Sequence, residues 1–212
     1  MYILRFIIFV FIFLSTHSIA ALKSDLRTIL KERDFYTRTN LEYLLEGHTV
    51  ANSDVETYKG ELNGEKDSKK QKMLTKVAAF HSLDCNPVLK KLSQYERYDS
   101  YFDFIKNSKY QNGHATMNLN ISLISVNFDI DMKIDRVNKV GKYDFILNAG
   151  DMKNVIGFLE VKELRGRCFV YTSMTYDGVH SGYWDSFMET FFTKVAYLGV
   201  DKIFKISGHR AK

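Results

Sequence analysis

Several motifs that mark catalytic proteins are missing from this sequence of 212 residues. It has no Gly-rich phosphate-binding loop and no Gly-x-Ser-x-Gly nucleophile elbow. The histidines are dispersed without the spacing of metal ligands; they include His48, His81, His114, His180 and His209. We therefore expect no metal and no cofactor, and the sequence alone identifies no catalytic residue.

Cysteine is also scarce, because only Cys85 and Cys168 occur. In an oxidising compartment they could form one disulfide. Two free, buried thiols are the alternative, since nothing in the sequence fixes the distance between two positions so far apart.

The chain lacks a strong excess of one charge, with a formal net charge of +5. Its one basic cluster, Lys66 to Lys72, is interrupted by Asp67 and Ser68 and is typical of a solvated loop. No basic stripe with interleaved aromatic residues is present, so we do not expect a nucleic-acid partner.

The N-terminus has the pattern of a secretion signal. Residues 1–5 form a short basic segment, residues 6–14 are all apolar, and small residues stand at Ser18 and Ala20. The apolar run is shorter than the roughly 20 residues that span a bilayer, although an uncleaved anchor is the alternative. No cysteine follows Ala20, which argues against a lipoprotein. We predict a signal peptide over residues 1–20 and an exported protein, either periplasmic or secreted.

Helical and polar segments come next. Apolar residues at helical spacing predict one or two helices over residues 22–45. Residues 52–72 are rich in Gly, Asp, Ser, Lys and Glu, which indicates an edge hairpin or a loop. We therefore expect an N-terminal helical and polar extension over residues 21–72.

Strict alternation of apolar and polar residues dominates the middle of the chain. This period of two predicts strands over residues 117–123 and 126–134, each with one face on a core or cavity, and further strands are expected over residues 143–147, 155–164 and 168–176. Turn residues separate them, so the strands are expected to form an antiparallel meander.

The period changes at the C-terminal end. Trp184, Met188, Phe191, Val195 and Leu198 follow one another at steps of four and three residues, which predicts an amphipathic helix wide enough to cover a sheet. The predicted fold class is α+β, with a curved antiparallel sheet wrapped around one long C-terminal helix. The space between sheet and helix can be a ligand cavity.

Several local strings occur in an order that resembles one family. They are Val77-Ala78-Ala79-Phe80, Asn86-Pro87-Val88-Leu89, Leu92-Ser93-Gln94-Tyr95-Glu96-Arg97-Tyr98-Asp99, and the stretch from Phe102 to Ser108. This arrangement is similar to the opening of START-like (SRPBCC) domains, in which a first strand leads to a proline-marked helix. The resemblance extends to Phe204 and implies a helix-grip domain over residues 73–207. It also implies a cavity for lipids, sterols, quinones or other apolar molecules, which supports ring cyclisation in some members.

The candidate ligand-binding residues lie on the inward strand faces and on one face of the C-terminal helix. They are Phe128, Ile130, Met132, Phe145, Met174, Trp184, Met188, Phe191 and Val195. Each can equally be plain core, because apolar side chains at these spacings usually are. The predicted partners are an apolar small molecule or lipid and, transiently, a membrane.

Three further functions stay open. A cyclase or hydratase could use the same cavity, and an interaction protein would fill the cavity with its own side chains. Asp144, Glu160 and Lys162 match the acidic-acidic-lysine pattern of a metal-dependent nuclease superfamily, in which the metal activates water. Glu160 and Lys162 share one strand face and are also compatible with a surface ion pair.

Overall fold

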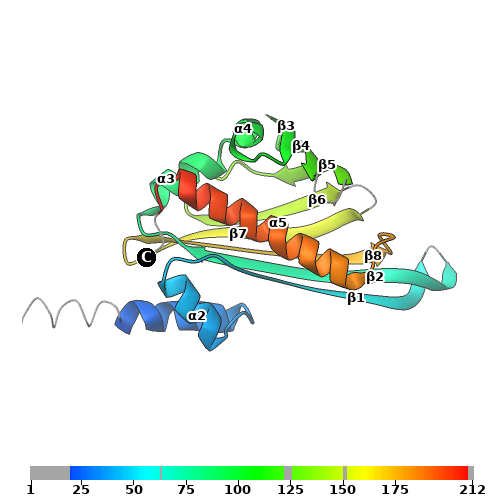
Figure 1. The fold of residues 1–212 in the computed structure, drawn as a ribbon, viewed down its shortest axis with the longest axis horizontal. Coiled ribbons are helices and arrows are strands. Elements are labelled where there is room, and N and C mark those ends of the chain that lie inside the picture. Colours follow the sequence, from blue (N-terminus) through cyan, green and yellow to red (C-terminus); the bar gives the residue numbers. More distant parts are fainter. Residues whose placement is uncertain (1–19, 63, 122–125, 150–151, 210–212) are drawn as a thin grey trace, which may run out of the picture.

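The computed structural model describes residues 20–62, 64–121, 126–149 and 152–209 (Figure 1). The predicted signal peptide falls almost entirely outside these residues. Among the described residues, no helix is long and apolar enough to span a membrane.

Eight antiparallel strands form one sheet in the order β1-β2-β8-β7-β6-β5-β4-β3. The strands are β1 Val50–Leu62, β2 Glu65–Phe80, β3 Ile105–Gln111, β4 His114–Ile121, β5 Val126–Ile134, β6 Gly141–Ala149, β7 Met152–Leu164 and β8 Arg167–Val179. The chain runs from β3 to β8 as a meander, because each of these strands pairs with the next. The predicted meander is confirmed.

Helices cover both faces of the sheet (Figure 1). A helix over residues 20–32 and α2 (Arg38–Leu45) precede the sheet, and α3 (Cys85–Leu92), η1 (Tyr95–Arg97) and α4 (Tyr98–Tyr101) connect β2 to β3. The long C-terminal helix, α5 (Asp185–Ile206), lies across one face. We call this the inner face.

Alternation along β2 shows how one strand serves two cores. Ala79 belongs to the main core under α5, with Phe204 of that helix, and Val77 is buried two residues earlier on the same face of the strand. Ala78 and Phe80 belong to a second core on the outer face, packed against the N-terminal helices. Since successive strand residues point to opposite faces, the apolar run at the end of β2 is buried from both sides. The helix-grip α+β fold with an N-terminal helical extension is thus confirmed.

The boundary expected at residue 73 falls inside β2. Of the two structures expected for the polar segment before it, a hairpin rather than a loop is observed, in which β1 and β2 pair from Val50↔Ala78 to Leu62↔Glu65. Its strands are part of the main sheet, because β2 also pairs with β8. The sheet therefore begins at Val50, within the segment assigned to the extension.

Candidate functional site

An apolar cavity of about 240 Å³ lies between α5, the inner face of the sheet and the α3–α4 connection. Its walls come from elements far apart in the sequence. The lining residues are Val77, Leu92, Tyr95, Tyr98, Phe102, Met132, Ile134, Phe145, Leu159, Val170, Thr172, Met174, Val195, Ala196, Gly199, Val200, Ile203 and Phe204.

Four of the predicted ligand-binding residues line this cavity. Met132 comes from β5, Phe145 from β6 and Met174 from β8, while Val195 comes from α5. All three strand residues stand at inward positions of the period-two pattern, which is why sequence periodicity could select them. That they contact a ligand stays a prediction.

The other five candidates lie elsewhere. Ile130 packs against the main core and borders a separate polar depression over β4–β6. Met188 and Phe191 belong to a third apolar cluster, at the N-terminal half of α5. Trp184 precedes α5 and is 69% exposed. The side chain of Phe128 lies outside the part that the structure describes.

Sequence reasoning missed the lining residues of the α3–α4 connection and of the C-terminal half of α5. Tyr95, Tyr98 and Phe102 are contributed by the connection. Gly199 and Ile203 continue the stripe of α5 that contains Val195, at a spacing of four residues. Steps of four residues from Val195 would have found this second group.

Every hydroxyl group that lines the cavity already has a hydrogen-bond acceptor. Tyr98 donates to the Leu92 carbonyl at 2.9 Å and Tyr95 to the Asp135 carbonyl at 3.4 Å. Thr172 donates to a β7 carbonyl at 2.7 Å. Burial raises the pKa of both tyrosines, so both stay protonated. The cavity therefore offers apolar contact rather than a free acid or base.

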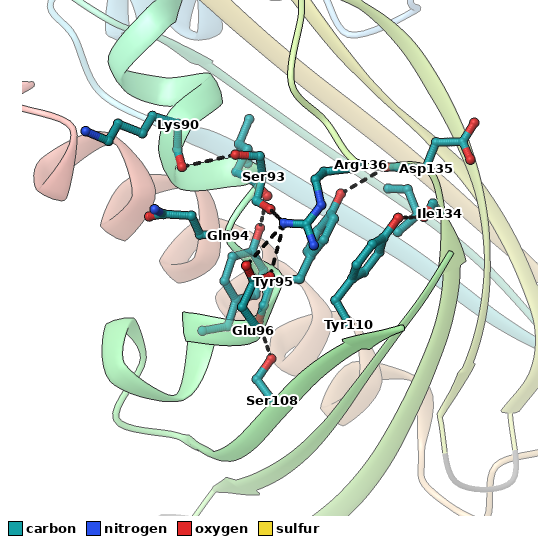
Figure 2. A network of polar contacts seen from close by, with 12 residues as sticks. Lys90, Ser93, Gln94, Tyr95, Glu96, Ser108, Tyr110, Ile134, Asp135 and Arg136 are labelled. Atoms are coloured by element: carbon teal, nitrogen blue, oxygen red, sulfur yellow. Dashed lines mark hydrogen bonds and ion pairs between the residues drawn. The ribbon is translucent and has the colours of Figure 1, made fainter. Parts of the chain in front are cut away.

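Arg136, just after β5, fastens the α3–α4 connection to the sheet (Figure 2). Its guanidinium donates to the Ser93 carbonyl and to the carboxylate of Glu96, at 3.1 Å and 3.2 Å. It also stands 4.4 Å from the ring centre of Tyr110, which in turn stacks on Tyr95 at 5.0 Å. This network fixes the position of one cavity-lining tyrosine.

A disulfide between Cys85 and Cys168 attaches the other end of that connection. It joins the first residue of α3 to β8, with the two Cα atoms 4.6 Å apart. The question that the sequence left open is thus answered in favour of a disulfide. The α3–α4 wall is held covalently at one end and by Arg136 at the other.

The nuclease pattern lies on the outer face, away from the cavity. Glu160 is paired with Arg33 of the N-terminal extension at 2.8 Å. Asp144 is 82% exposed and pairs with Lys142 at 3.4 Å. The two carboxylates thus face separate cations, and Glu160 pairs with Arg33 rather than with Lys162.

The comparisons with known proteins concern the fold. No family model matches this sequence, and no curated protein is significantly similar to it. A conserved protein from Geobacillus kaustophilus is similar in structure, with a TM-score of 0.51 and 13% identity over 65% of this chain and 97% of that chain.

Two further solved structures are similar to the chain. Ara h 8.0201 has a TM-score of 0.48 and 13% identity over 65% of this chain and 96% of its own. A START superfamily protein from Mycobacterium smegmatis has a TM-score of 0.46 and 8% identity, over 63% and 92%. At such identities the likeness concerns the fold alone. With the strand order and the position of α5, the chain has a helix-grip fold.

Proposed function

We propose that this protein is an exported binding or carrier protein for a small apolar ligand, held in the cavity beneath α5. The observation that carries the proposal is the chemical character of the side chains that line the cavity. The cavity is lined mainly by apolar side chains, and its three hydroxyl groups already donate to backbone carbonyls. Binding an apolar ligand in such a site is favoured by the burial of apolar surface. A cyclase or hydratase would need unpaired polar groups, and none of the lining hydroxyl groups is unpaired.

The size of the cavity narrows the class of ligand. A volume of 240 Å³ corresponds to about eight water molecules at roughly 30 Å³ each. Pockets for drug-sized ligands occupy about 300–1,000 Å³. The volume therefore favours a single acyl chain or a single ring system over a two-chain phospholipid or a tetracyclic sterol.

Two features support export. Residues 1–20 have the pattern of a secretion signal. The disulfide between Cys85 and Cys168 is the kind of bond that persists in oxidising compartments and is rare in the cytosol. The N-terminal sequence of the protein recovered from a periplasmic or culture fraction tests this part: processing after Ala20 supports it, and an intact chain in the cytosol contradicts it.

Native mass spectrometry tests the binding function. The chain is expressed in a bacterial host, purified without detergent, and compared with its mass after denaturation. We expect a stoichiometric apolar adduct that organic extraction identifies as a single-chain or single-ring compound. An empty protein that also takes up no member of a panel of fatty acids and simple quinones would overturn the proposal in favour of an interaction protein.

A further inference from the structure

One flank of α5 presents large apolar side chains to solvent. Trp184, just before the helix, is 69% exposed, and Leu198 is 48% exposed. Between them Phe187 and Phe191 are only partly buried. Ring centres of neighbouring members stand 5.7 Å and 6.1 Å apart along the helix. We call these four residues the α5 flank; their spacing of three, four and seven residues places them on one side of the helix.

The opposite side of α5 is bound to the edge of the sheet. Asp185 accepts a hydrogen bond from the backbone N–H of Thr57 at 2.9 Å, and Glu189 accepts one from that of Val55 at 3.3 Å. Both donors belong to β1, the edge strand. The two carboxylates cover part of this edge and fix the rotation of the helix. The α5 flank therefore faces away from β1.

Two lysines lie beside the α5 flank. Lys194 stands between Phe191 and Leu198 and is exposed, and Lys202 lies one turn beyond Leu198. Neither makes an ion pair within the described part of the chain, whereas Lys205 is paired with Asp201 at 2.7 Å. An apolar stripe with Trp, Phe and Leu bordered by lysines is the composition of helices that lie in a membrane interface.

The α5 flank is continuous with the cavity. Phe187 and Phe191 pack against the same apolar cluster as Met174, and Met174 lines the cavity. Val195, one turn after Phe191, lines it as well. An apolar molecule moving from the surface at Phe191 towards Val195 would meet apolar side chains along this route.

We propose that the α5 flank docks on an anionic phospholipid surface, with the ring of Trp184 at the level of the headgroups and Lys194 and Lys202 against lipid phosphates. This inference rests on the proposed function, because it assigns the route by which the apolar ligand enters the cavity. Tryptophan favours membrane interfaces, and each lysine near an anionic surface strengthens binding.

The first test needs no substitution, because Trp184 is the only tryptophan in the sequence. Its emission is recorded with vesicles of phosphatidylcholine alone and of phosphatidylcholine with phosphatidylglycerol. We expect a blue shift with the anionic vesicles, quenching by brominated acyl chains, and a much smaller response with the neutral vesicles. No shift with anionic vesicles overturns the proposal, and an equal response to both compositions overturns its electrostatic part.

A charge variant with a matched control makes the test specific. Lys194→Gln with Lys202→Gln is expected to weaken binding to anionic vesicles by about thirty-fold, from the contribution of two lysines. Lys106→Gln with Lys109→Gln removes the same charge from exposed positions of β3, at the other edge of the sheet, and is expected to bind as the unmodified protein does. Equal losses in both variants would show that net charge alone acts, and would overturn the assignment to α5.

Ligand binding without vesicles separates this inference from the proposed function. Trp184→Ser is expected to keep the affinity for decanoic acid in solution and to lose vesicle binding, measured by sedimentation with the vesicles. If the unmodified protein sediments with vesicles and binds no apolar ligand, the proposed function fails and the docking surface stands. If Trp184→Ser sediments as fully as the unmodified protein, the docking surface fails.

Discussion

Filling the cavity from α5 should weaken ligand binding without damaging the fold. Gly199 lies in the middle of the helix positions that line the cavity, between Val195 and Ile203. A Cβ atom added at Gly199 would meet no heavy atom within 4 Å. A larger side chain at this position can therefore extend into the open space, and Gly199→Phe is the substitution of choice.

The expected loss of affinity follows from the volumes of the cavity and the new side chain, and the expected change in stability follows from helix propensity. A cavity of about 150 Å³ holds one benzene molecule, so a benzyl group occupies more than half of the 240 Å³ available. We expect Gly199→Phe to weaken binding of decanoic acid at least tenfold. Gly199→Ala leaves the volume almost unchanged and should stabilise the protein by about 1 kcal/mol, because glycine in a helix interior costs that much relative to alanine.

Calorimetric titration with decanoic acid and thermal unfolding measure these two effects. The unmodified protein and Gly199→Ala should bind with equal affinity and a negative heat-capacity change. Gly199→Ala should also unfold about 2–4 °C higher than the unmodified protein. If Gly199→Phe binds as tightly as Gly199→Ala, the cavity is not the ligand site. If Gly199→Phe unfolds far below Gly199→Ala, the space is not open and our reasoning about it is wrong.

Three further predictions concern the walls of the cavity and the core. The double substitution Cys85→Ser and Cys168→Ser removes a cross-link over 83 residues and should cost about 4 kcal/mol in urea unfolding; an unchanged midpoint would contradict this. Arg136→Lys should cost about 1 kcal/mol, because an ammonium cannot replace both the stacking and the forked hydrogen bonds; an unchanged urea midpoint would refute that role. Burial, and then repulsion by His209, lower the pKa of His81 from 6.5. The folded state therefore takes up this proton less readily than the unfolded state, so stability should fall as pH drops below about 6.5. His81→Asn should lose that part of the pH profile, and an identical profile would exclude His81 as its source.

The sequence predicted the elements whose periodicity is strong. β4 and β5 alternate in polarity along most of their length, and a half-buried strand leaves this pattern whatever its neighbours are. The C-terminal helix was predicted from the spacing of Met188, Phe191 and Val195, all within the observed α5. These local patterns thus predicted the fold class.

The β1–β2 hairpin gave a much weaker signal. Within β1 the polar side chain of Ser53 is buried, where it pairs with Thr75 of β2. The free edge of β1 donates hydrogen bonds to the carboxylates of Asp185 and Glu189 on α5. These residues are more than 120 positions away in the sequence. The alternation of polar and apolar residues within β1 does not reveal that one edge of this strand is hydrogen-bonded to carboxylates on a distant helix.

The site was only partly predictable because α5 is apolar over a wide arc. The residues at one end of this arc line the cavity, as Val195 does, whereas Met188 packs in a separate cluster and Trp184 faces solvent. The rotation of α5 on the sheet decides between these outcomes. That rotation depends on contacts with β1 that no window of α5 contains.

The sequence by itself determined the strands of the meander, the long final helix and the N-terminal signal pattern, because each depends on residues close together in the chain. Only the tertiary structure decided the pairing of Cys85 with Cys168, the 240 Å³ cavity and the outward position of Trp184. These features arise where segments distant in sequence meet. Their geometry is set by packing across the sheet rather than by local periodicity.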